Sequence, residues 1–130
     1  MVVRMGLGDA VLMTGYISLD LEFWANVDVF CLPSRSEGRS LALLEAMANR
    51  LACVASDIPA NRELLDPGRG FLFQPGSDAG LATHLRELVR DGTLRDRIGE
   101  NAHDWIRRNA TFERVVAAME RVYADVGDHH

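Results

Sequence analysis

One short segment of the sequence has the residue types that bind a phosphorylated ligand: Glu37, Gly38, Arg39, Ser40 and Leu41. Gly38 permits a tight turn and lets a ligand approach the backbone closely. If a helix begins near Ser40, the amides of about residues 39–41 have no acceptor inside that helix. With the helix dipole they would form an anion site suited to phosphate, to which Arg39 adds a full positive charge.

A second carboxylate, Glu45, follows about 1.5 helical turns into the expected helix. Leu41, Glu45 and Ala48 share a face that is otherwise apolar. A carboxylate on such a face costs free energy unless something binds it. The two adjacent hydroxyls of a ribose would do so, and Glu37 could accept hydrogen bonds from the hydroxyls of a sugar. One loop and one helix could therefore hold ribose, phosphate and sugar in a row.

Each of these features also has a simpler explanation. A loop with a glycine between a strand and a helix is common in α/β proteins. Glu37 near a helix N-terminus is favourable because of the dipole alone. Glu45 could be a solvated side chain at the edge of its helix. The residues by themselves leave both explanations open.

The elements that position this segment can be predicted from apolar runs and their period. Strands are predicted at residues 11–14, 28–32, 51–55 and 70–73. Helices are predicted at residues 19–26 with Ser18 as N-cap, and at residues 40–49, 59–65, 79–90, 93–109 and 112–124. Continuous apolar strands that alternate with helices predict an α/β fold with a parallel sheet covered on both faces. Ligands bind such sheets beyond the carboxyl ends of the strands, so the loop that Pro33 opens is the first candidate.

Composition limits the class of protein. The chain has 130 residues, 48% of them hydrophobic, and a net charge of −5, which suits one globular domain and gives no basic field for nucleic acid. No apolar run approaches the length of about 20 residues that a membrane span needs, and the first residues do not resemble a signal peptide. Cys31 and Cys53 lie in apolar runs, which predicts reduced core residues and a cytoplasmic location.

The histidines do not suggest a metal site. His84 and His103 have no cysteine or histidine partner at metal-ligand spacing. His129 and His130 end the chain and resemble the remnant of a purification tag, so we expect residues 127–130 to be a tail. No metal and no other cofactor is expected.

The spacing of Glu37 and Glu45, with seven residues between them, resembles the E-x7-E motif of retaining GT-B glycosyltransferases, in particular glycosyltransferase family 4. The context is similar too. NVDVFCLPSRSEG precedes the motif, and LEAMANRLACVASD resembles the family's "lEAma-G-pVvaSd". Later segments, IPANRELL, GRGFLFQPGSDAGLATHLREL and TFERVVAAMERVYADV, are similar to the family's next loop, its continuation and its closing helix. The resemblance covers about residues 11–126.

This resemblance implies a fold of two Rossmann-like domains with the active site between them, of which this chain would be part of the C-terminal, nucleotide-sugar-binding one. In that family the residue matching Glu45 binds the ribose, and the one matching Glu37 faces the donor sugar as a catalytic group. The amides near Arg39, Ser40 and Leu41 would meet the diphosphate, and Pro33 and Ser34 would lie near the base. Transfer would retain the anomeric configuration and need no metal.

The sequence departs from the family pattern at four positions. Arg39 and Ser40 stand where the family has an aromatic residue and a second glycine, although Ser40 can still cap the helix. Arg50 stands for a glycine and Ala52 for a proline, which puts the path of residues 49–53 in doubt.

The resemblance also implies missing parts. The family's C-terminal domain opens with a strand and a helix that carry an arginine and a lysine for the diphosphate, and an acceptor-binding domain precedes it. We therefore expect residues 1–126 to be a partial domain that binds nucleotide weakly and transfers no sugar alone. Any peripheral membrane association would run through the absent half. A sheet edge without its usual neighbour predicts a homodimer.

Two other classes of function remain open at this point. One is another GT-B enzyme, such as a sugar-nucleotide epimerase. The other is a non-catalytic α/β interaction module. Elsewhere in the chain, Trp24 and Trp105 are expected to pack in the core or between subdomains rather than to stack on a ligand. Arg62 and Glu63 could form a lip of the donor cleft, but a solvated helix start is the favoured interpretation.

Overall fold

The computed structural model describes residues 4–36, 38, 40–109, 117 and 120. In chain order its elements are α1 (Leu21–Ala25), β1 (Val29–Leu32), α2 (Leu41–Ala48), β2 (Ala52–Ser56), α3 (Pro59–Leu65), β3 (Phe71–Phe73), α4 (Asp78–Arg90) and α5 (Gly92–Arg108). These elements confirm the predicted order of strands and helices from residue 19 onward, with small shifts at the ends. Of the helix predicted at residues 112–124 the structure describes only residues 117 and 120, both of them helical, so its extent stays a prediction.

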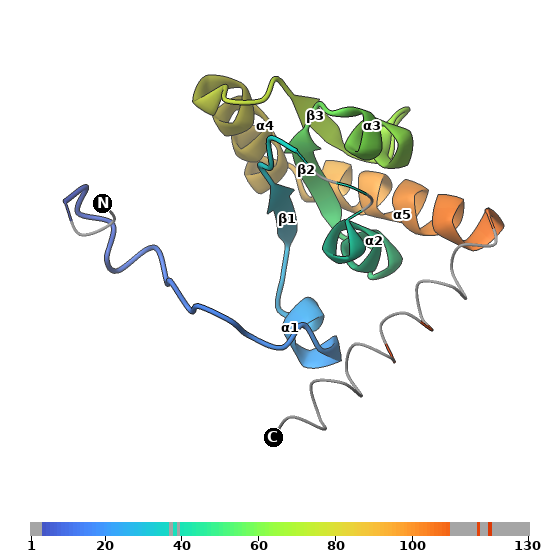
Figure 1. Cartoon of the computed structure of the whole chain (residues 1–130), viewed down its shortest axis with the longest axis horizontal. Helices are drawn as coiled ribbons and strands as arrows, with labels where there is room; N and C mark the ends of the chain where they lie inside the picture. The colour runs from blue at the N-terminus through green and yellow to red at the C-terminus, as the bar shows by residue number, and fades with distance from the viewer. Residues whose placement is uncertain (1–3, 37, 39, 110–116, 118–119, 121–130) are drawn as a thin grey trace.

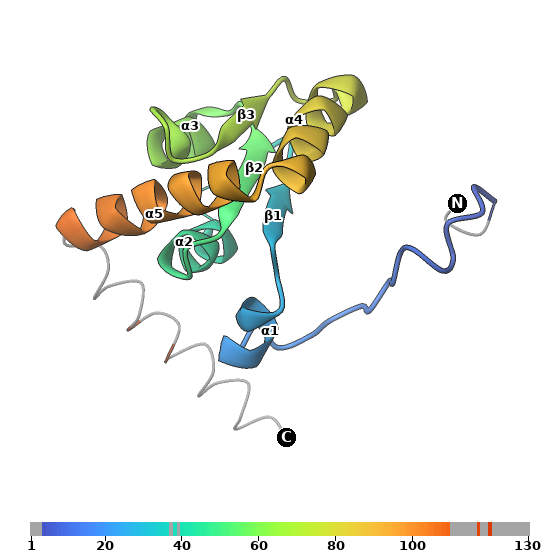
Figure 2. The same cartoon turned by 180° about the vertical axis from the view of Figure 1, so that it is seen from behind.

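The three strands form a parallel sheet in the order β1-β2-β3. Val29 is opposite Ala52, and Val54 is opposite Phe71, so the strands run side by side in one direction. Figures 1 and 2 show helices on both sides of this sheet. The predicted fold class is therefore confirmed: the chain is an α/β protein with a Rossmann-like parallel sheet.

The central strand β2 divides the core into two clusters, because alternate side chains of a strand point to opposite faces. Cys53 and Ala55 belong to a cluster that contains Trp24 and residues of α2, α3 and the second half of α5. Ala52 and Val54 belong to a cluster with residues of α4 and the first half of α5. All five residues of β2 are buried, which explains why the first four of them are all apolar.

Side-chain caps fix where most of the helices begin. The hydroxyl of Ser77 accepts from the amide of Gly80 at 3.0 Å, and Asp91 accepts from Leu94 at 3.0 Å. The prediction of Ser18 as the cap of α1 is wrong: Asp20 Oδ1 accepts from the amide of Phe23 at 2.8 Å. A cap must stand immediately before the first helical residue for its side chain to reach the amides of the first turn, and Ser18 lies too early.

The strand predicted at residues 11–14 is wrong as well. This stretch is not a strand in the structure, and Leu12 and Met13 are 84% and 78% exposed. The whole segment from residue 4 to residue 20 runs away from the sheet in both views (Figures 1 and 2). A strand needs a neighbour for its backbone hydrogen bonds, and no strand of the described sheet lies beside this segment.

The outer edges of the described sheet are β1 and β3. The homodimer expected through an exposed edge stays a prediction. No helix within the described part of the chain has the length and apolar character to cross a membrane.

The two cysteines are both free, but only one lies in the core. Cys53 is fully buried on β2, and burial raises the pKa of its thiol. Cys31 is only half-buried, contrary to the expectation, because β1 is an edge strand; burial raises the pKa of its thiol too.

The turn after α2 follows the path that the usual glycine would allow, although Arg50 occupies the position. Arg50 has a left-handed φ of 61°. Its amide donates to Met47 O at 3.2 Å, and the amide of Leu51 donates to Ala46 O at 3.1 Å. These two bonds make a Schellman motif, in which the left-handed residue is usually glycine. Residues 49–53 therefore keep the turn, and Arg50 adopts a left-handed conformation that is unfavourable for a residue with a side chain.

We expect the substitution Arg50→Gly to stabilise the domain by about 1 kcal/mol, because it relieves the left-handed conformation. The loss of the ion pair between Arg50 Nε and Glu100 Oε1, at 2.9 Å with both side chains more than half exposed, should offset little of this gain. Urea denaturation followed by circular dichroism measures the change. Glu100→Gln, which removes the ion pair alone, is the control, and a less stable Arg50→Gly variant would contradict the interpretation.

Candidate donor-binding site

The loop predicted to bind a ligand lies at the carboxyl edge of the sheet. β1 ends at Leu32 and α2 begins at Leu41, so residues 33–40 connect them at that edge. Pro33 is exposed and Ser34 is half-buried. Gly38 is exposed, and a Cβ atom added there would meet nothing within 4 Å. Close approach of a ligand to Gly38 therefore stays a prediction, as do the roles of Glu37 and Arg39, which lie outside the described residues.

The beginning of α2 has the cap that the sequence predicts, but its first helical amides are those of Leu41 and Ala42, later than the predicted residues 39–41. Ser40 is the N-cap, and its Oγ accepts from the amide of Leu43 at 3.2 Å. Its carbonyl accepts from the amide of Leu44 at 3.2 Å, which closes the first helical turn. The geometry of an α-helix gives the amides of Leu41 and Ala42 no acceptor within the helix. Two amides at the positive end of the helix dipole are thus left for another acceptor.

Glu45 is deeply buried on α2. Only 3% of its surface is exposed, so the alternative of a solvated carboxylate is wrong. Its Oε2 accepts a hydrogen bond of 3.1 Å from the indole Nε1 of Trp24 on α1. The sequence argument that a ligand must satisfy this carboxylate is weakened, because the protein itself supplies a partner. Ribose binding by Glu45 stays a prediction.

Trp24 is a component of the core, as expected, and its indole also donates the hydrogen bond to Glu45 of the candidate site. It is 2% exposed, and its ring makes edge contacts with Phe23 at 5.1 Å and with Phe30 at 5.6 Å between centroids. Sequence reasoning missed its bond to Glu45. A signal existed, since a buried tryptophan needs an acceptor for its N–H. Nothing in the sequence shows that this acceptor lies on the helix after the next strand.

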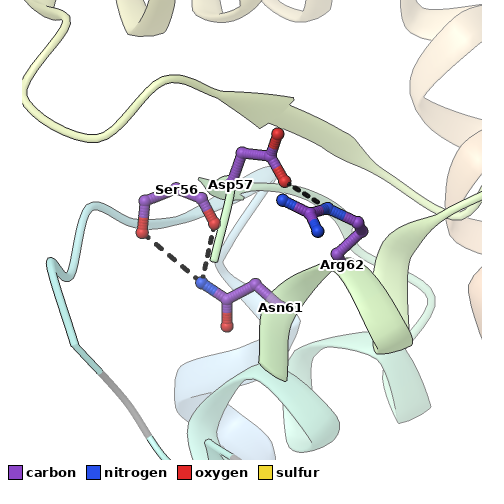
Figure 3. A network of polar contacts seen from close by, with 4 residues as sticks. All are labelled: Ser56, Asp57, Asn61 and Arg62. Carbon is purple, nitrogen blue, oxygen red and sulfur yellow. Dashed lines mark hydrogen bonds and ion pairs between the residues drawn. The ribbon is translucent and has the colours of Figure 1, made fainter. Parts of the chain in front are cut away.

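A polar network joins the candidate loop to the two segments beside it. Ser56, at the end of β2, donates from its hydroxyl to the carbonyl of Ser34. Asn61, near the beginning of α3, donates from Nδ2 to the carbonyl of Ser56 at 3.0 Å, and more weakly to its Oγ at 3.4 Å (Figure 3). Sequence reasoning missed both residues. The network fixes the backbone of the loop after β1 to the end of β2.

Arg62 and Asp57 lie next to this network, as Figure 3 shows. Arg62 Nε pairs with Asp57 Oδ1 at 2.8 Å, and the two side chains are 52% and 41% exposed. Arg62 and Glu63 are both exposed, which agrees with the expectation of a solvated helix start.

Within the described ranges, no group of three or more histidine, cysteine or acidic side chains could hold a metal ion. His84 stacks on Phe71 with the ring centroids 4.7 Å apart, and its Nε2 lies 3.1 Å from the carbonyl of Leu72. His103 Nδ1 lies 3.0 Å from the carbonyl of Ala48. Both imidazoles therefore contact backbone carbonyls within the fold, and that of His84 also stacks on a phenylalanine ring.

Curated relatives of this chain include sugar transferases and a synthase. The lipopolysaccharide core biosynthesis mannosyltransferase LpcC of Rhizobium leguminosarum bv. viciae is 36% identical over 124 residues, which are 94% of this chain and 35% of that protein. The N-acetyl-alpha-D-glucosaminyl L-malate synthase of Bacillus anthracis is 30% identical over 127 residues, which are 97% of this chain and 33% of that protein. The chain thus spans about a third of the length of these relatives.

Solved structures agree in fold. The C-terminal domain of the group 1 glycosyl transferase LpcC from Francisella tularensis superposes with a TM-score of 0.72 at 29% identity, over 82% of this chain and 57% of that one. Anabaena HepE in complex with UDP gives a TM-score of 0.74 at 23% identity, over 98% and 35% of the two chains, and shares the fold. The family model for glycosyl transferases group 1 matches residues 2–105. The chain therefore belongs to the group 1 glycosyl transferase family.

Proposed function

We propose that this chain is the donor-binding part of a glycosyltransferase that takes a sugar from a nucleoside-diphosphate sugar and retains its anomeric configuration. The observation that carries the proposal is the family match, which spans the candidate loop, α2 and nearly all of the described core. The E-x7-E spacing of Glu37 and Glu45 supports the assignment to the retaining family 4. HepE, which shares the fold, was solved with UDP, and this supports a nucleotide ligand.

In this proposal Glu45 accepts hydrogen bonds from the ribose hydroxyls. A carboxylate offers about four acceptor positions, and the bond from Trp24 Nε1 takes one of them. Trp24 would fix the orientation of the carboxylate before a ligand arrives. This preorganisation lowers the entropic cost of binding.

The diphosphate binds at the beginning of α2 in this proposal. Ser40 Oγ already occupies the amide of Leu43, so the amides of Leu41 and Ala42 remain for phosphate oxygens. Arg39 would add its charge, which takes the part that a divalent metal has in other transferases. Glu37 would face the donor sugar as the catalytic group, and Pro33 and Ser34 would lie near the base.

The proposed active protein needs more than this domain. Residues 1–126 would form the nucleotide-sugar-binding domain, and a separate domain would bind the acceptor. We propose that the complete enzyme works in the cytoplasm and that the chain of 130 residues binds nucleotide but transfers no sugar.

Calorimetric titration of the chain with UDP, GDP and ADP tests the donor site. We expect one of them to bind, and Glu45→Gln to weaken that binding about tenfold or more, because a hydrogen bond to a charged group contributes about 1.5–3 kcal/mol. Glu87→Gln makes the same change in charge at an exposed position of α4 and should leave the affinity unchanged. The proposal fails if none of the three nucleotides binds at millimolar concentration, or if both variants bind as the unaltered chain does. Sugar transfer by the chain alone would overturn the need for a second domain.

A further inference from the structure

Asn61 is an unusual residue for its location. Its side chain is fully buried, with 0% of the residue exposed, at the first turn of α3. Nδ2 must face the carbonyl of Ser56, because an amide oxygen in that place would repel it. The other end of the amide, Oδ1, then points away from Ser56 (Figure 3) and has no hydrogen-bond donor among the described residues.

An unsatisfied buried acceptor costs stability, so an apolar residue of similar volume would suit α3 better if packing were its only task. What asparagine supplies and an apolar residue lacks is the pair of bonds to Ser56. The hydroxyl of Ser56 in turn donates to the carbonyl of Ser34 in the loop after β1. An N–H that approaches Ser56 Oγ occupies a lone pair of that oxygen, which leaves the O–H for Ser34 and strengthens its bond by polarisation.

We infer that Asn61 is a positioning residue for the donor loop, which acts through Ser56 on the backbone of Ser34. The relay joins the carboxyl end of β1, the carboxyl end of β2 and the beginning of α3, and no side chain of the relay needs to touch the ligand. This inference rests on the proposed function for its effect on nucleotide binding. The effect of Asn61 on the backbone of the loop does not depend on the proposed function.

The first experiment measures amide hydrogen exchange of residues 34–36 in the chain without ligand. Ser56→Ala and Asn61→Ala should each speed this exchange about tenfold. The double variant should be no faster than the faster single variant, because the two single variants and the double variant all break the same relay. Arg62→Ala is the matched control: it breaks the neighbouring ion pair to Asp57, between the same two segments, and should leave residues 34–36 unchanged. If Asn61→Ala reduces the yield of folded protein, Ser56→Ala still tests the link.

The second experiment measures nucleotide affinity and thermal unfolding of the same variants. We expect Ser56→Ala and Asn61→Ala to weaken nucleotide binding about tenfold, with Arg62→Ala unaffected. Unchanged exchange at residues 34–36, additive effects in the double variant, or an equal effect of Arg62→Ala would overturn the inference. Faster exchange in a chain whose unaltered form binds no nucleotide would overturn the proposed function and leave the structural relay standing.

Discussion

Gly99→Ala should destabilise the domain by about 3 kcal/mol or more, the upper end of what overpacking costs. A Cβ atom at this position of α5 would lie 2.0 Å from the carbonyl oxygen of Arg50 and 2.7 Å from its carbonyl carbon. Both atoms are backbone and belong to the Schellman turn after α2, so they cannot rotate away. The two helices must separate or the turn must open, and either change loosens the larger core cluster.

Urea denaturation of Gly99→Ala, followed by circular dichroism, measures this loss. Gly92→Ala is the matched control in the same helix. A Cβ atom at Gly92 would approach only the end of the flexible Arg95 side chain, at 3.3 Å, so this variant should be neutral or gain up to about 1 kcal/mol from lower chain entropy. Equal midpoints for the two variants would show that the close approach of α5 to Arg50 is not a constraint.

Trp24→Ala should be comparably severe, at about 3–5 kcal/mol for the loss of a large buried aromatic side chain. The variant removes the edge contacts to Phe23 and Phe30 and also the hydrogen bond to the buried carboxylate of Glu45. The variant Trp24→Phe separates the loss of apolar packing from the loss of the hydrogen bond. It keeps most of the apolar packing, and it should cost about 1–3 kcal/mol because Glu45 loses a donor.

Trp105→Ala is the control for Trp24→Ala. Trp105 is only half-buried at the edge of the same cluster, with the guanidinium of Arg69 lying 4.6 Å from the centre of its ring. We expect its loss to cost clearly less than that of Trp24 in the same urea titration. If Trp24→Phe were as stable as the unaltered chain, the bond to Glu45 would contribute nothing to folding.

The fold could be predicted from residue 19 onward because its signals are local. The apolar runs at residues 51–55 and 70–73 and the capping serine at position 40 each report on a single element. The same reasoning failed at residues 11–14, because an apolar run predicts a strand only where a neighbour can pair with it. Arg50 is an intermediate case: its side chain argues against a left-handed turn, and the surrounding motif imposes one.

The candidate site was harder to predict than the fold. Its loop and the cap at Ser40 follow from the chain itself, but the residues that hold the loop and Glu45 come from elsewhere. Trp24 lies 21 positions before Glu45, and Ser56 lies 22 positions after Ser34. Periodicity and spacing describe one element at a time, so they cannot show which buried polar groups of different elements will meet.

The order of the strands has a consequence for how the chain acquires its structure. Every strand pairs with the next one along the chain, so each pairing needs only one helical crossover, and the partners Val29 and Ala52 are 23 positions apart and Val54 and Phe71 are 17 apart. Helix α5 differs, because it supplies Leu94 and Ile98 to one core cluster and Ala102 and Ile106 to the other. During synthesis α5 leaves the ribosome after all three strands. We expect the two faces of the sheet to become a single cooperative unit only when this helix docks.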